Sequence, residues 1–557
     1  MFITKTSLGS LSSFLKNSRA NVAPIFAIAI IPVIGLMGAA IDYGRAASIR
    51  AGMQSALDAT ALAMSRLAPT LTQSQLQTQT TAYFLTMFNY PDAKNLTITP
   101  TYTTTGGSQL TIATTSTMDT TFMRVMGFTS LNLGSSTTVK WGNVRLRVAL
   151  VLDTTGSMSD DGKMAAMQTA TKALLTQLKT AATTNGDAYV SIIPFSKNVN
   201  VGPSNYNATW IDWTGWEAEP TFTKPSNWSS IGPGSTCPFT NTNNGFVCTT
   251  GPVNNASPTS TIPSSGSYSG YICPDVDSGK KYPTKIGIYY NGCYSSVPTT
   301  TTVTNTVETG KNADCNSYSN CTGTGSGSGK VCKQTVTTTG APYTHNWIVS
   351  AHSTWNGCVA DRGGVNAPSG DYDRVITSPS TSITATLFPA EQNSYCSPAI
   401  MGLTYTWSTM NTLVENLFPA GATNQPIGLV WGWQSLVGGG PLTMPAKDSN
   451  YTYNDVIVLL SDGLNTLDRW YGNGSSTNTT VDQRMYESLT VGTCANIKAA
   501  KITIYTVHVN TGGDPTSTLL QNCATDKDKF WMVTTASGIG TVFNQIGTQL
   551  SKLRVAK

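Results

Sequence analysis

One stretch near the N-terminus carries no charged residue for twenty-two positions. It runs from Ala20 to Ile41, between Arg19 and Asp42, and reads ANVAPIFAIAIIPVIGLMGAAI. As an α-helix it would be roughly 33 Å long, which is enough to cross the ~30 Å hydrocarbon core of a bilayer. The segment therefore predicts a transmembrane helix at residues 20–41. The alternative is a cleaved signal peptide, with the small residues Gly38 and Ala40 before the cut.

The cysteines indicate on which side of the membrane the bulk of the chain lies. The chain has eleven, nine of them between Cys237 and Cys396, followed by Cys494 and Cys523. No two are spaced as in the C-x₂₋₄-C pairs of zinc sites, so disulfides in an oxidising compartment are the better interpretation. We therefore expect residues 1–19 to be a cytoplasmic tail and everything after Ile41 to lie outside the cytoplasm. Because eleven is odd, one thiol is left over or pairs between chains.

The composition argues against a nucleic-acid partner. Charged residues make up 11% of the 557, against about 25% in typical soluble proteins. The formal net charge of +5 is too small for a chain of this length to indicate nucleic-acid binding. Thr, Ser, Asn and Gly take the place of the missing charges, which is typical of an exported, loop-rich β surface.

Residues 42–143 predict a membrane-proximal helix and a small α+β unit. Met53, Leu57, Ala61 and Met64 fall on one face of a helix spanning 42–67. That face packs either on its own domain or on a partner's membrane-proximal helix. Alternation of Thr with apolar residues predicts strands, with a short helix before the last. The strands are expected at 96–102, 110–116 and 130–141, and the short helix at 122–128.

Residues 144–557 predict an α/β domain with a doubly wound, Rossmann-like parallel sheet. The apolar run 145–153 (RLRVALVLD) is typical of a buried parallel strand and leads through a loop into an amphipathic helix, 164–178. Further strands are expected at 189–195, 456–460, 502–509 and 529–534, and further helices at 426–436, 517–523 and 539–553.

Two of these strands end in acidic loops. Asp153-Thr154-Thr155-Gly156-Ser157 fits D-x-[ST]-x-S and resembles the first metal-contacting loop of von Willebrand factor A (VWFA) domains. Ser461-Asp462-Gly463 resembles the second acidic loop of that family, and Thr423 its lone threonine. The resemblance implies a VWFA domain whose metal-ion-dependent adhesion site (MIDAS) consists of Asp153, Thr155, Ser157, Thr423 and Asp462.

The residue types suit that chemistry. Mg²⁺ prefers about six oxygen ligands and keeps several waters; Mn²⁺ or Ca²⁺ are the other candidates. Hydroxyls of Thr155, Ser157 and Thr423 can ligate directly or through water, while Asp153 and Asp462 supply charge largely through water. One position then stays open for an Asp or Glu carboxylate of a protein ligand. The alternative is that these residues only cap helices and turns, as Asp153 and Ser157 could.

A second resemblance concerns the N-terminus. NVAPIFAIAIIPVIGLMGAAIDYGRAA followed by MQSALDATALA, in residues 21–63, resembles the TadE/TadG-like pilus-assembly proteins. Two later stretches, 355–362 and 423–436, also resemble TadG-like proteins. The resemblance implies a membrane-anchored component of the bacterial machine that secretes and assembles Flp-type tight-adherence pili, with other pilus-assembly membrane proteins as partners. It also implies a single-pass protein of the inner membrane whose bulk after Ile41 is periplasmic.

The region at about 197–395 interrupts the α/β domain. A structureless loop of that length is implausible in a compact domain, so we expect an inserted β-rich subdomain held by disulfides. Two disulfides are predicted: Cys494 with Cys523, which flank the strand at 502–509, and Cys358 with Cys396.

No convincing catalytic constellation occurs, so the leading interpretation is a non-enzymatic component of a tight-adherence pilus apparatus that binds a protein through a metal. The alternative is a surface adhesin that binds a host or matrix ligand through the same domain.

Overall fold

The computed structural model describes residues 22–104, 107–141, 144–182, 184–240, 244–252, 256–277, 289–363 and 373–555. The predicted cytoplasmic tail, 1–19, lies outside these residues. The chain divides into two compact units. The first comprises Met1–Val144 with Lys447–Thr452 and Leu553–Lys557, and the second comprises Arg145–Ala446 with Tyr453–Lys552.

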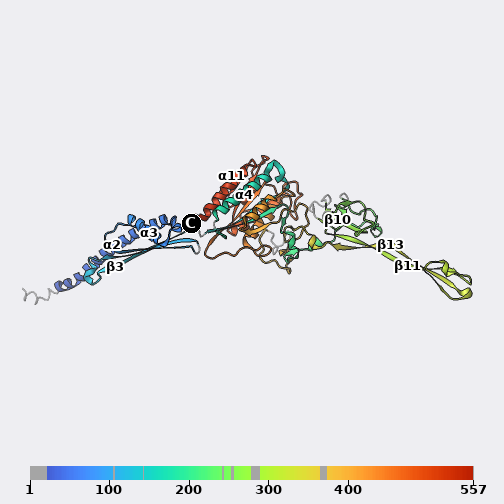
Figure 1. Ribbon diagram of the computed structural model, residues 1–557, viewed down its shortest axis with the longest axis horizontal. Helices are drawn as coiled ribbons and strands as arrows, with labels where there is room; N and C mark the ends of the chain where they lie inside the picture. The colour runs from blue at the N-terminus through green and yellow to red at the C-terminus, as the bar shows by residue number, and fades with distance from the viewer. Residues whose placement is uncertain are drawn as a thin grey trace, which may run out of the picture. The chain divides into compact units, whose positions relative to one another are not determined.

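The first unit packs helices on an antiparallel three-stranded sheet with the order β1-β2-β3 (Figure 1). Met53, Leu57 and Ala61 of α2 are fully buried in one core with Leu110 and Ile112 of the sheet. The predicted helix face thus packs on its own domain, and the alternative of a partner's helix on that face is wrong. The elements are α2 (Val22–Ser65), α3 (Gln73–Met87), β1 (Ala93–Thr103), β2 (Ser108–Asp119), the 3₁₀-helix η2 (Met123–Met126) and β3 (Ser130–Trp141).

The N-terminal half of α2 has a different surface. Ile28, Ile31 and Leu36 are each 70% exposed or more, whereas the C-terminal half of the helix enters the core. Among the described residues, α2 is the one helix long and apolar enough to cross a membrane. The predicted membrane segment and membrane-proximal helix are therefore parts of one continuous helix.

Asp42 joins the two halves of α2 to the loop between β2 and β3. Its side chain is fully buried, and its carboxylate accepts hydrogen bonds from the backbone N–H groups of Thr121, Phe122 and Met123 at 2.8 to 3.1 Å. These N–H groups lie at the start of η2, where a helix has no internal acceptors for them. Asp42 thus fixes the β2–β3 loop against α2.

Replacing Asp42 by alanine is expected to destabilise this loop by about 1–3 kcal/mol, because three partly buried backbone donors lose a charged acceptor. Hydrogen exchange of residues 120–129 in the full chain measures the effect. Asp58→Ala, on the exposed side of the same helix, is the matched control and should leave exchange in this loop unchanged. Equal exchange in the wild type and Asp42→Ala would contradict the assigned role.

The second unit is built on a six-stranded sheet with the order β16-β5-β4-β17-β18-β19. β5 runs parallel to β4, β18 to β17 and β19 to β18, whereas the edge strand β16 is antiparallel to β5. The strands are β4 (Val144–Asp153), β5 (Ala188–Phe195), β16 (Met401–Thr404), β17 (Thr452–Ser461), β18 (Thr503–Val509) and β19 (Phe530–Val533).

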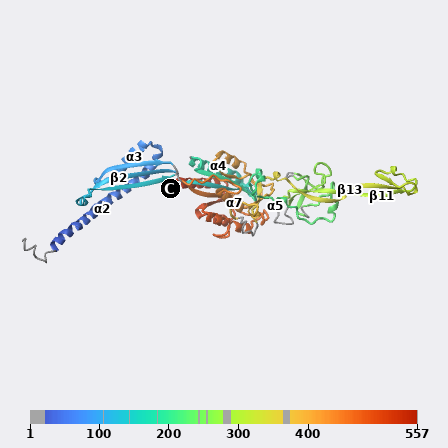
Figure 2. The ribbon, with the colours of Figure 1, turned by 90° about the horizontal axis from the view of Figure 1, so that it is seen from below.

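Helices cover both faces of this sheet (Figure 2). Val148 and Leu150 of β4 point into a core shared with α4, α6 and α11, and Ala149 and Val151 into a core shared with α7 to α10. α7 lies so close to the sheet that a Cβ atom at Gly432 would be 2.6 Å from Val151 Cγ2. The helices are α4 (Lys163–Ala181), α6 (Trp407–Glu415), α7 (Gln425–Val437), α8 (Thr479–Met485), α9 (Thr493–Ala499), α10 (Thr518–Cys523) and α11 (Gly538–Val555).

The interrupting region consists of two parts. Its two ends belong to the α/β core, since Val199, Trp216, Trp355 and Phe388 are buried against the sheet and α7. The prediction of one separate subdomain over 197–395 therefore needs correction: apolar side chains at both ends pack on the parent domain. These ends contain β6 (Val199–Asn200), β7 (Ile211–Asp212), α5 (Thr214–Glu217), β14 (Cys358–Val359) and β15 (Phe388–Pro389).

The middle of the region forms a second six-stranded sheet, β12-β13-β11-β10-β8-β9, with its own small apolar core. A long antiparallel hairpin of β11 and β13 extends from it (Figure 1). Its strands are β8 (Phe246–Thr249), β9 (Pro258–Thr259), β10 (Tyr271–Asp277), β11 (Gly292–Thr309), β12 (Cys321–Thr324) and β13 (Val331–Val349).

Five disulfides hold the second unit. Cys358 pairs with Cys396 and Cys494 with Cys523, which are the two pairs expected from the sequence. The others are Cys237–Cys248, Cys273–Cys293 and Cys315–Cys332. Cys321 is the cysteine left over.

Candidate metal site

Three loops meet at one end of the α/β sheet. The first follows β4, the second precedes α7, and the third follows β17. The amide of Gly156 donates to the carbonyl of Gly421 at 2.9 Å, and the amide of Thr466 donates to the carbonyl of Thr423 at 3.0 Å. Loops that are far apart in sequence are thus tied together through their backbones.

Asp153 is held directly by Thr155 and Ser461, and through Ser461 by Gln425 at the start of α7. Its Oδ1 accepts from the amide and hydroxyl of Thr155 at 2.8 and 2.6 Å. Its Oδ2 accepts from the Ser461 hydroxyl at 2.6 Å, and Ser461 Oγ in turn accepts from Gln425 Nε2 at 2.8 Å. Asp153, Thr155, Gln425 and Ser461 are each fully buried, so this carboxylate has one fixed orientation.

The five predicted residues form two layers. Ser157, Thr423 and Asp462 line a cavity of about 380 Å³. Asp153 and Thr155 are buried behind it, and the Thr155 hydroxyl lies 3.2 Å from the Ser157 hydroxyl. The structure therefore brings all five residues to one place, with hydroxyls between the deeper carboxylate and the cavity.

A lysine lies in the same cavity. Lys163, the first residue of α4, places its Nζ 3.1 Å from Asp462 Oδ2, and both side chains are 9% exposed. Asp160 and Asp161 also line this cavity. The sequence analysis did not single out Lys163 as a functional residue. The signal that could have found it is a positively charged residue ten positions after Asp153.

Electrostatics favour a cation here. Burial, and after it the charge of Asp462, raise the pKa of Asp153 to about 7, although the hydrogen bonds from Ser461 and Thr155 act in the opposite direction. A buried carboxylate whose ionisation is disfavoured by burial and by a neighbouring negative charge is stabilised by a nearby positive charge. Lys163 supplies one such charge.

The donor set fits a hard divalent cation. Mg²⁺ and Mn²⁺ prefer oxygen ligands, and the cavity offers hydroxyl and carboxylate oxygens from Ser157, Thr423 and Asp462. The orientation of Asp153 through Thr155 is the kind of supporting hydrogen bonding that metal sites use. A bound cation would share Asp462 with the ammonium of Lys163.

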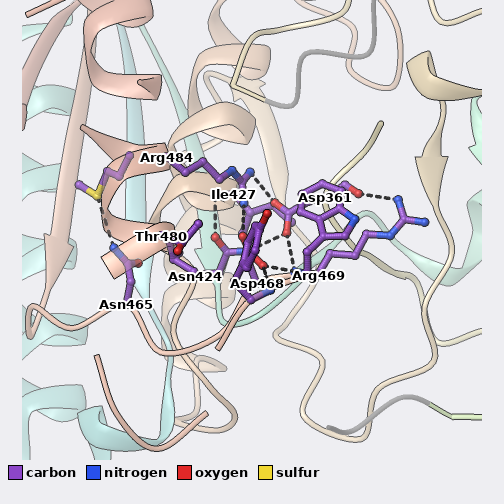
Figure 3. A network of polar contacts seen from close by, with 12 residues as sticks. Asp361, Asn424, Ile427, Asn465, Asp468, Arg469, Thr480 and Arg484 are labelled. Carbon is purple, nitrogen blue, oxygen red and sulfur yellow. Dashed lines mark hydrogen bonds and ion pairs between the residues drawn. The ribbon is translucent and has the colours of Figure 1, made fainter. Parts of the chain in front are cut away.

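A buried ion network supports the Thr423 loop (Figure 3). Asn424 accepts from the amide of Ile427 at the start of α7 and donates to Asp361 Oδ2 at 2.9 Å. Arg484 donates to Asp361 Oδ1 at 2.6 Å and also contacts Asp468 at 3.4 Å. Asp361 thus links α8 to the residue that follows Thr423.

Arg484 is the centre of this network. Its side chain is 3% exposed, and it pairs with Asp361, Asp373 and Asp468. Burial and the charge of Asp361 raise the pKa of Asp468, and Arg484 counteracts that rise. Sequence analysis missed this network because the Arg484 and Asp361 side chains that bond to each other are 123 positions apart.

The raised pKa of Asp153 predicts a pH dependence of stability without added metal. Unfolded Asp has a pKa of about 3.9, so between about pH 4 and 7 the native state binds more protons than the unfolded state. The free energy of unfolding should fall as pH rises through this window, by at most about 1.4 kcal/mol per pH unit from this group.

Thermal unfolding of the full chain in EDTA, measured between pH 4.5 and 8, tests this sign. The isosteric Asp153→Asn variant cannot ionise here, so its pH slope should be shallower. Identical slopes in the wild type and the variant would contradict the assignment.

Comparisons with solved structures give low similarity. The VWF domain of the type V pilus tip protein Mfa5 from Porphyromonas gingivalis matches at 8% identity and TM-score 0.29, covering 74% of this chain and 97% of Mfa5's domain. The pilus adhesin SpaC from Lactobacillus rhamnosus GG matches at 12% identity and TM-score 0.28, covering 84% of this chain. The matched region spans 35% of the SpaC chain. PilB minor pilin from Streptococcus sanguinis matches at 10% identity and TM-score 0.29, covering 82% of this chain and 78% of PilB.

No curated protein matches the chain. A family model does match its N-terminus: residues 20–66 match the family described as putative Flp pilus-assembly TadE/G-like. This match lies on α2 and coincides with the segment that carries the resemblance in the sequence. The N-terminal segment of this chain is therefore similar to the TadE/G-like Flp pilus-assembly family over residues 20–66.

Proposed function

We propose that the chain is a non-enzymatic, membrane-anchored component of a tight-adherence (Flp/Tad) pilus apparatus, and that its α/β domain is a VWFA domain that binds a protein ligand through a divalent cation. The observation that carries the binding role is the meeting of Asp153, Ser157, Thr423 and Asp462 from three separate loops. The TadE/G-like match at residues 20–66 supports the pilus apparatus. Residues 20–41 would be the anchor, with the bulk of the chain in the periplasm.

The residues have distinct roles in this proposal. Ser157, Thr423 and Asp462 would hold the cation from the cavity wall. Asp153 fixes the hydroxyl of Thr155, which lies beside that of Ser157. When bound, the cation would supply an open coordination position for an Asp or Glu carboxylate of the ligand. Because the cavity opens at the surface, a carboxylate on another protein can reach it.

The sheet topology is the second support. In an open α/β sheet, ligands bind beyond the carboxyl ends of the parallel strands. Asp153 is the last residue of β4, and Asp462 directly follows β17. The site thus lies where this architecture presents ligands.

Complementation of a deletion strain tests the function. Cells with wild-type chain should assemble pili, whereas cells with Ser157→Ala should show few or none at equal protein level in the inner membrane. Asp528→Ala, an exposed carboxylate of the same domain outside the cavity, is the matched control. Normal piliation with Ser157→Ala but lost attachment to surfaces would instead favour the adhesin. Normal piliation and normal attachment would contradict both roles.

A further inference from the structure

The loop between β2 and β3 exposes apolar side chains beside α2. Val125 is 88% exposed, Phe128 57%, Met126 55% and Phe122 41%. Exposed large apolar residues are common singly on soluble surfaces, but a contiguous group of them marks an interaction site. Four within seven consecutive residues form such a group, which we call the apolar loop (residues 120–129).

The apolar loop lies level with the predicted membrane segment. A side chain at Gly38 of α2 would lie 2.3 Å from Phe122 Cβ, and one at Gly35 would lie 3.0 Å from Met126 Sδ. Both glycines fall inside 20–41, the segment whose own apolar side chains are exposed, such as Leu36 at 70%. Any bilayer that reaches Ile41 therefore also surrounds the loop.

The backbone N–H groups of the apolar loop also have hydrogen-bond acceptors, as contact with lipid requires. Asp42 accepts the amides of Thr121, Phe122 and Met123. Within the loop, the amides of Val125, Gly127 and Phe128 donate to loop carbonyls. Exposed backbone groups without partners are costly in lipid, and here the donors named are already paired.

We propose that the apolar loop is a second membrane-contacting element, which inserts Phe122, Val125, Met126 and Phe128 into the bilayer half on the Asp42 side of α2. Arg124, which is exposed within it, can reach lipid phosphates at the same level. Because Asp42 fixes the loop to α2, insertion of the loop would also set the depth and tilt of the helix. The proposal rests on the proposed role of α2 as membrane anchor.

Site-directed spin labelling tests it on the full chain in vesicles of phosphatidylethanolamine and phosphatidylglycerol. Cys321→Ser removes the thiol left over, and single cysteines are introduced as Val125→Cys, Ile31→Cys and Leu62→Cys. Leu62 is 68% exposed and lies on α2 roughly 30 Å beyond Ile41, so it is the matched aqueous control.

The loop label is expected to lose collisions with a water-soluble nickel complex and to keep collisions with oxygen, as the Ile31 label does and the Leu62 label does not. If the label at Ile31 is shielded from the nickel complex but the label at Val125 collides with it as freely as the label at Leu62, the loop proposal is overturned and the anchor stands. If Ile31 also collides freely with nickel, the anchor itself fails, and the loop proposal fails with it.

Discussion

Replacing Asp153 by asparagine is expected to weaken Mg²⁺ and Mn²⁺ binding about 10–100-fold, the usual cost of losing a group that supports a metal ligand. The substitution removes one full charge from a site in which Asp153 and Asp462 lie together. It conserves the volume of a fully buried side chain, which alanine would not. Asparagine can still accept from Thr155, so the loop should keep its conformation.

Calorimetric titration of the full chain in detergent with each cation measures this effect. Asp528→Asn, outside the cavity, should bind as the wild type does. Near-UV circular dichroism of Asp153→Asn should match the wild type, which separates lost affinity from lost fold. Unchanged affinity in Asp153→Asn would contradict the assignment of the site.

Replacing Arg484 by methionine is expected to destabilise the α/β domain by about 3–5 kcal/mol, the typical cost of removing one partner from a buried ion pair. The substitution leaves Asp361, Asp373 and Asp468 without the guanidinium that they share. Because Asp361 holds Asn424, which directly follows Thr423, the start of α7 should open more often.

Hydrogen exchange of α7 and of residues 355–362 in the full chain measures the loss. Lys172→Met is the matched control, since Lys172 and Glu415 form an exposed pair with side chains 39% and 59% accessible, and such pairs contribute at most about 1 kcal/mol. Adding Asp361→Asn to Arg484→Met should recover part of the stability. Equal protection of α7 in Arg484→Met and Lys172→Met would contradict the role of the network.

The parts of the fold that follow from local pattern could be predicted from the sequence. Residues 148–152 are apolar on both faces and lead into Asp153, as a buried parallel strand requires, and the structure places β4 there. β5, β17 and β18 were found in the same way. The short edge strand β16 (Met401–Thr404) was missed because four residues carry no clear periodicity.

The parts that depend on distant contacts could not be predicted. Trp355 is buried against the parent domain, but a tryptophan in a Gly- and Thr-rich stretch looks the same whether it packs there or in a separate subdomain. The pairs Cys494–Cys523 and Cys358–Cys396 could be proposed because each joins segments that were expected to meet at the edge of the domain. The ion pair of Arg484 with Asp361 has no local signature, because each residue alone is an ordinary charge.

The central claim is that a divalent cation binds where the three loops meet, and its position can be observed directly. Crystals of the full chain grown with Mn²⁺ should show one strong anomalous peak in the cavity, bordered by Ser157, Thr423 and Asp462, and the peak should be weaker with Asp153→Asn at the same Mn²⁺ concentration. A cavity without an anomalous peak at millimolar Mn²⁺, with Lys163 still paired to Asp462, would contradict the account.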